Sequence, residues 1–240
     1  ENVAGPVWDG RRISSPTVAY IPGKARPYIL AYQAQHDTST ARLVGIATAE
    51  TATGDVVDGT FKRLSLSGVG VTAPVVSTSV SVTAVDSEQV IHPALWYDAS
   101  TQLLHLWYTG RFGSPDQFAT ARATCDTAVS DCGLATDWVK ADANSDGDPD
   151  VWVEGTPATW DNDDVRQMFV MAHSDPGNFF GAEIEAWYTG ASVDVGSVEG
   201  EIDDATTWLE SEANPVLTPT TAVGRYDSES TTGRGVRYDT

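Results

Sequence analysis

One short segment of the sequence carries oxygen-bearing side chains at alternate positions, a pattern suited to holding a metal ion. These residues are Asp142, Asn144, Asp146, Asp148 and Asp150. Gly147 stands among them, where the lack of a Cβ permits a sharp turn. A hard cation such as Ca²⁺ takes roughly six to eight oxygen ligands, and alternate residues of a tight loop can converge on one point. The segment therefore predicts a calcium-binding loop.

The surroundings of this loop are those of a β-hairpin rather than of two helices. An EF-hand needs Glu at the twelfth loop position, where Val153 stands, and Asp150 runs directly into a strand-like sequence. The pattern resembles the Asp-x-Asn-x-Asp-Gly-x-x-Asp loop of FG-GAP and related propeller repeats. That resemblance implies side-chain ligation by Asp142, Asn144, Asp146 and Asp150, and main-chain ligation by Asp148. The alternative is an acidic, solvated turn.

The elements that must position such a loop recur along the chain. Four blocks lead from an aspartate into an apolar run, and these aspartates are Asp9, Asp86, Asp161 and Asp227. A second run rich in aromatic and β-branched residues follows at 28–32, 104–110 and 184–190, and two of these runs end in Thr-Gly. A third run lies at 43–48, 118–121 and 195–198, and a fourth contains Trp138 or Trp208. Four short strands per repeat predict an all-β fold of four-stranded antiparallel blades, a β-propeller.

The repeats resemble the five-bladed propellers of the arabinanase, β-xylosidase and invertase glycosidases. The resemblance is carried by the Pro-x-Val/Leu-x-x-Tyr first strand, by Leu-Trp-Tyr-Thr-Gly in the second strand, and by Asn214-Pro215-Val216-Leu217. It implies a single propeller domain over residues 1–240, with units at about 8–84, 85–159 and 160–225 and the start of a fourth at 226–240. A closed five-bladed ring needs roughly another 80–100 residues. We expect a further chain segment, another chain or an unusual edge to complete it.

The resembled enzymes place carboxylates at the axial ends of their inner strands, because most glycosidases need two such groups beside the scissile bond. One of these carboxylates directly precedes the inner-strand proline. The matching positions in this sequence are Ser15, His92, Gln167 and Gly233. None is acidic, which favours a non-catalytic propeller over an enzyme that uses the standard mechanism.

Other residues near these strand ends are candidates for binding a ligand in the central cavity. They are His92, Asp86, Asp161 and Arg166. Each candidate also has a structural interpretation. A histidine at this place can be a packed, hydrogen-bonded residue, and an aspartate that recurs in every unit can serve a turn or the start of a strand. Trp107, Tyr108, Trp187 and Tyr188 recur in the same way, which favours core packing over sugar stacking.

Composition narrows the setting in which such a protein works. Against 34 acidic residues stand 14 basic ones, a net charge of −20 that opposes binding to nucleic acid. The sequence holds no apolar run near the roughly 18–20 residues of a membrane helix. Cys125 and Cys132 are the two cysteines, and their spacing predicts a local disulfide, which indicates an oxidising compartment.

Together these features predict a secreted or cell-surface β-propeller with one calcium loop inserted between two of its units. We expect it to be non-catalytic and to recognise carbohydrate or an extracellular protein, or to take part in an extracellular assembly. A purely structural repeat within a longer secreted protein is a further possibility. The alternative function is a glycoside hydrolase that acts on a polysaccharide with carboxylates in atypical places.

Overall fold

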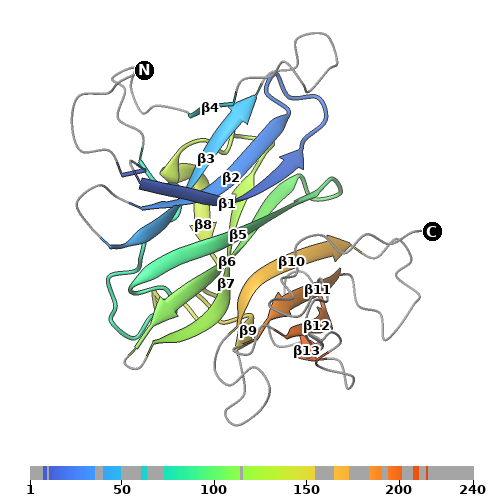
Figure 1. The fold of residues 1–240 in the computed structure, drawn as a ribbon. Helices are drawn as coiled ribbons and strands as arrows, with labels where there is room; N and C mark the ends of the chain where they lie inside the picture. The colour runs from blue at the N-terminus through green and yellow to red at the C-terminus, as the bar shows by residue number, and fades with distance from the viewer. Residues whose placement is uncertain are drawn as a thin grey trace, which may run out of the picture.

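Three antiparallel β-sheets make up the described part of a computed structural model of the chain (Figure 1). The structure describes residues 8–9, 11–35, 40–49, 61–63, 73–113, 116–154, 165–172, 184–190, 194–201, 208–210 and 215. In these residues the non-strand regular structure is one 3₁₀ turn, Ala135–Asp137. No helix in this described part has the length and apolar character needed to cross a membrane.

Each sheet is one blade, and its strands follow one another in chain order. The first blade contains β1 (Arg11–Tyr20), β2 (Tyr28–Gln35), β3 (Arg42–Ala49) and β4 (Lys62–Arg63). The second contains β5 (Gln89–Asp98), β6 (Leu103–Phe112), β7 (Gln117–Asp126), β8 (Trp138–Lys140) and β9 (Val153–Glu154). The third contains β10 (Arg166–Ala172), β11 (Ile184–Thr189), β12 (Val195–Gly200) and β13 (Leu209–Glu210).

Successive blades pack face to face because side chains alternate across each strand. One core cluster joins Ile29 and Ala31 of β2 to Leu104 and Leu106 of β6. The opposite face of the second blade, with Trp107, packs in a second cluster with residues of β10, β11 and β12. The first strand β5 contacts both β1 and β10, so the three first strands lie together. This is the propeller arrangement, and it confirms the predicted fold class and the four-stranded blades.

The outward face of the first blade has no neighbouring blade among the described residues. Val18 and Tyr20 of β1 are 52% and 54% exposed. The corresponding residues of the second blade, Leu95 and Tyr97, pack against the core cluster that the first two blades share. The predicted start of a fourth unit at 226–240 lies outside the described residues.

The acidic loop interrupts the outermost strand of the second blade rather than separating two blades. Strands β8 and β9 both pair with β7, so they are two halves of one edge strand. The chain leaves the sheet after Ala141, whose carbonyl oxygen accepts a hydrogen bond from the N–H of Asp150 at 2.8 Å. The sheet resumes at Trp152, whose N–H donates to the carbonyl of Thr120.

The disulfide closes the connection between β7 and β8. Cys125 and Cys132 form an S–S bond of 2.05 Å, and both residues are fully buried. The indole N–H of Trp138, at the start of β8, donates to the carbonyl of Cys132 at 3.0 Å. The predicted disulfide is therefore confirmed, and it lies where the edge strand begins.

Gly110 on β6 tests how closely the second blade approaches the segment before it. A Cβ at this position would overlap the backbone carbonyl of Val85. Because backbone cannot move as easily as a side-chain end, we expect Gly110→Ala to lower the free energy of unfolding by about 1–3 kcal/mol. The measurement is urea denaturation followed by tryptophan fluorescence. The first blade carries Ala34 at the matching place, so an unchanged midpoint in the variant contradicts the close approach at Val85.

Candidate functional site

The three first strands share a β-bulge at the same height along the propeller axis. In each strand two residues face a single tyrosine of the second strand, which is Tyr32, Tyr108 or Tyr188 in turn. The pairs that enclose the bulges are Ser14↔Gln33 and Thr17↔Ala31, Ile91↔Thr109 and Ala94↔Trp107, and Arg166↔Thr189 and Phe169↔Trp187. The bulge is thus a property of the repeat, not of one blade.

The first residue of each bulge adopts a left-handed backbone conformation. The φ angles are 50° at Ser15, 49° at His92 and 53° at Gln167, and none of these residues is glycine. A non-glycine residue in this region is strained by roughly 1–2 kcal/mol. Bulges of this kind redirect a side chain and gather beside functional sites. These are also the three described positions that match the inner-strand carboxylate of the resembled glycosidases.

His92 is held by a side chain from the first blade. Its backbone N–H donates to Oε1 of Gln33 at 2.9 Å, and Nε2 of Gln33 donates to Oγ of Ser14 at 2.8 Å. Gln33 is 5% exposed, so this bridge is buried. A second link crosses between the same blades, from the N–H of Leu95 to Oγ1 of Thr17 at 3.3 Å. The axial ends of the first and second blades are therefore joined by polar contacts.

Charged residues surround the same end of the second blade. Nε of Arg111 lies 3.2 Å from Oε2 of Glu88, the residue before β5. The guanidinium of Arg111 also pairs with Asp116, just before β7. Arg166 at the start of β10 places its guanidinium carbon 3.8 Å from the ring centre of Phe118. Exposed ion pairs of this kind add little stability, but they hold a carboxylate beside the strand ends where a ligand would bind.

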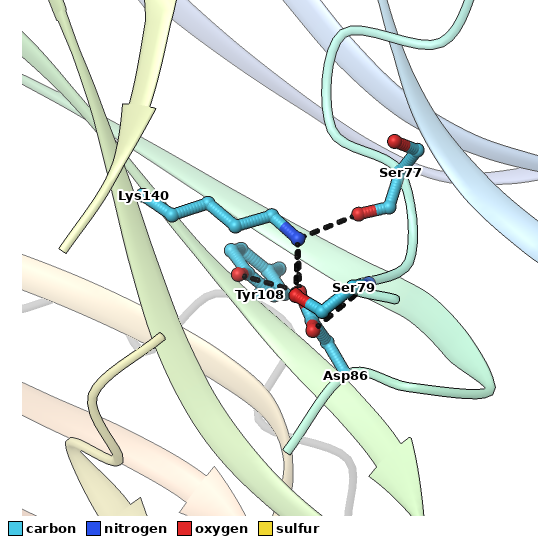
Figure 2. Close-up of polar contacts among 5 residues, drawn as sticks. All are labelled: Ser77, Ser79, Asp86, Tyr108 and Lys140. Atoms are coloured by element: carbon cyan, nitrogen blue, oxygen red, sulfur yellow. Dashed lines mark hydrogen bonds and ion pairs between the residues drawn. The ribbon is translucent and has the colours of Figure 1, made fainter. Parts of the chain in front are cut away.

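Asp86 lies in a buried network rather than on the surface (Figure 2). Its side chain is fully buried, and Oδ2 accepts hydrogen bonds from the Tyr108 hydroxyl at 3.0 Å and from Nζ of Lys140 at 2.6 Å. Lys140 also donates to the carbonyl oxygen of Ser77 and to Oγ of Ser79. Burial, together with the neighbouring carboxylate of Asp86, raises the pKa of Tyr108 well above its ordinary value.

The same pairing recurs in the first blade. The hydroxyl of Tyr32 donates to Oδ2 of Asp9 at 3.0 Å, and Asp9 is 3% exposed. Asp161, the matching residue of the third unit, lies outside the described residues. The recurrence in two blades favours the structural interpretation of these aspartates, a buried acceptor for the second-strand tyrosine. Among the predicted ligand-binding residues, His92 and Arg166 belong to the first strands and Asp86 does not reach the surface.

The repeated aromatic residues are part of the interior. Trp107 is fully buried, and its ring lies 5.4 Å from that of His105, 6.5 Å from that of Trp96 and 6.3 Å from that of Trp208. Trp187 is 5% exposed. These side chains fill the space between blades, as the repeat pattern predicted, and do not form an exposed platform for a sugar ring.

The carboxylates of the acidic loop accept backbone hydrogen bonds within the loop. Asp142 accepts the N–H groups of Asp146 and Gly147, while Asn144 also accepts that of Asp146. Oδ2 of Asp148 accepts the Ser81 hydroxyl at 2.9 Å. Carboxylate and amide oxygens suit a hard cation chemically. Within the described residues, however, no three His, Cys, Asp or Glu side chains converge as metal ligands, so the calcium site remains a prediction.

Comparison with known proteins supports the fold of the chain. Neither protein-family models nor curated protein sequences give a match. Among solved structures the chain is similar to that of a complex of BT0996 with RGII, at 17% identity and a TM-score of 0.56 over 90% of this chain and 60% of that one. It is also similar to Zg3597, a family 117 glycoside hydrolase of the marine bacterium Zobellia galactanivorans, at 16% identity and a TM-score of 0.54 over 87% and 58%.

A third similar structure comes from a study of mannoside phosphorylases and glycoside hydrolases of the GH130 family that target β-1,2 mannosidic linkages in Candida mannan. Its identity is 13% and its TM-score 0.53, over 89% of this chain and 54% of that one. The chain therefore spans between about half and three fifths of the length of these structures. These matches confirm the five-bladed propeller type that the repeats resembled.

The buried ion pair of Asp86 and Lys140 can be tested by removing the cation. Lys140→Met keeps most of the side-chain length but leaves a buried carboxylate without its partner, so we expect the free energy of unfolding to fall by about 3–5 kcal/mol. The double variant with Asp86→Asn should recover part of this loss. The control is Asp116→Asn, which breaks an exposed pair and should cost under about 1 kcal/mol. Equal effects of the two single variants in urea denaturation contradict the buried network.

Proposed function

We propose that this chain is the axial part of a carbohydrate-active propeller, whose ligand is a polysaccharide bound at the bulged ends of β1, β5 and β10. The bulge carries the proposal: three adjacent first strands place a strained, non-glycine residue at one height, and in the resembled glycosidases that height holds a group that contacts the sugar. Similarity in fold to structures of glycoside hydrolases supports the same ligand class.

The activity that we propose is hydrolysis of a glycosidic bond by carboxylates placed elsewhere than in the bulge. One carboxyl must protonate the departing oxygen, while the other attacks the sugar or activates water. Glu88 is the described carboxylate best suited to one of these roles, because it is exposed at the axial end and oriented by Arg111. Asp161, Asp163 and Asp164 precede β10 in the sequence and are the candidates for the second group.

A second candidate function, glycan recognition without turnover, is favoured by the identity of the bulge residues. Ser15, His92 and Gln167 can hydrogen-bond sugar hydroxyls, but none of them is a carboxylic acid of the kind used in the standard mechanism. The two candidates share the site and differ in whether the bound glycan is cleaved.

Glycan binding and cleavage can be measured separately on a panel of plant and microbial polysaccharides. We expect affinity electrophoresis to show binding to at least one of them, weakened by His92→Gln. If the protein is a hydrolase, reducing-sugar release should fall by about 10²–10⁴-fold in Glu88→Gln or Asp163→Asn, because each removes an acid–base group. Asp126→Asn, in the exposed β7–β8 connection, is the control. Binding without release selects recognition, and no binding to any glycan refutes both.

We also propose that the acidic loop binds Ca²⁺ through Asp142, Asn144, Asp146, Asp148 and Asp150. The support is the spacing of oxygen-bearing residues, the glycine at the sixth position with a φ of 92°, and backbone hydrogen bonds that already turn the loop. The buried disulfide supports a secreted or cell-surface location, where calcium is abundant and thiols are oxidised.

Calcium binding should appear as a shift in thermal stability. A ligand that binds only the folded state at about 100 times its Kd adds about 2.7 kcal/mol, so chelation should lower the Tm and added Ca²⁺ should restore it. Asp146→Ala should abolish this response. The matched control is Asp126→Ala, since Asp126 also accepts a backbone N–H, that of Ala128 at 2.8 Å, in a turn outside the loop. A Tm that is insensitive to chelation in the wild type refutes the calcium site.

A further inference from the structure

The second strands of the three blades differ at the one position that faces the bulge. Gln33, Thr109 and Thr189 occupy it, each paired with the residue just before a bulge. Thr189 donates to the carbonyl of Arg166 within its own blade at 3.0 Å. Thr109 is buried and its hydroxyl has no hydrogen-bond partner. Of these three residues, Gln33 is the one that crosses to the next blade.

This crossing side chain completes the hydrogen bonding of the strained residue. A β-bulge leaves one residue out of the ladder, and the N–H of His92 is directed instead to Gln33. The glutamine amide has both an acceptor and donors, so it accepts from His92 and donates to Ser14 at the same time. With 5% exposure, Gln33 leaves little room for water to replace it. The left-handed conformation of His92 is thus supported from the neighbouring blade.

The third blade carries the same bulge without such a support. Threonine replaces glutamine at Thr109 and is too short to span the gap between blades. Oε1 of Gln167, the left-handed residue of this bulge, is buried and has no hydrogen-bond partner. The axial site is therefore asymmetric, with one bulge braced across the blade boundary and the next one not.

We propose that Gln33 is a positioning residue that presents His92 to the bound glycan. The inference rests on the proposed glycan site and assigns to Gln33 a role that needs no contact with the ligand. Holding His92 in its binding conformation before the ligand arrives removes an ordering cost from association. Gln167 lacks this brace, so its side chain is the one that adjusts to the ligand.

The test compares two substitutions of Gln33. Gln33→Thr installs the residue of the other two blades and should free His92, because threonine cannot reach its N–H. Gln33→Glu keeps an acceptor for His92 and can accept the Ser14 hydroxyl, so it should rescue the wild-type behaviour. Lys140→Met is the stability control, since it destabilises the fold away from the axis and should leave glycan affinity unchanged.

Two readouts separate positioning from general stability. The imidazole signals of the four histidines, recorded by NMR on histidine-labelled protein and assigned with His92→Gln, should move for His92 in Gln33→Thr and not in Gln33→Glu. Affinity electrophoresis with the best-bound polysaccharide of the panel should show a Kd raised about tenfold in Gln33→Thr, the cost of ordering a loosened contact.

The outcomes distinguish the inference from the function on which it rests. If the wild type binds a glycan and Gln33→Thr binds it within twofold, the positioning role is overturned while the glycan site stands. Unmoved His92 signals in Gln33→Thr overturn it as well. If the wild type binds no polysaccharide, the proposed function fails, and the positioning role fails with it.

Discussion

The fold depends on one constraint: each sheet has two apolar faces, and each face must be covered by a neighbouring sheet. The second blade shows the constraint satisfied, because Leu104 and Leu106 face the first blade while Trp107 faces the third. The first blade shows it half satisfied, with Val18 and Tyr20 exposed on the side where no described blade lies. A three-blade array with the same packing at each boundary accounts for the match to structures longer than this chain.

The axial bulges follow from the same packing. First strands of successive blades converge near the axis, where regular pleating would crowd them, and a bulge increases the local bend and twist of each strand. Because all three bulges lie opposite the second-strand tyrosine, they keep the blades in equivalent positions. Strain at Ser15, His92 and Gln167 is then a cost that the buried sheets can absorb, and it turns three side chains away from the regular strand pattern.

Sequence patterns predicted the parts of the structure that repeat. Alternating apolar residues and the recurring Asp and Tyr were sufficient for the strands, the blades and the core role of Trp107, because repetition averages out local exceptions. The disulfide followed from two cysteines with no other partner. The left-handed backbone at His92 was not predictable, since histidine does not favour positive φ and the cause lies in Gln33, far away in sequence. Nor did the spacing reveal that the acidic loop divides an edge strand.

The position of that loop links it to the buried charge network. Lys140 ends β8 two residues before Asp142, and its ammonium group reaches Ser77, Ser79 and Asp86. Asp148, on the far side of the loop, accepts the Ser81 hydroxyl. The segment that leads into the second blade is therefore held at two points by the interrupted edge strand. In a chain of net charge −20, like-charge repulsion among the loop carboxylates acts on this same segment, so a cation bound there would stabilise the start of the blade and not the loop alone.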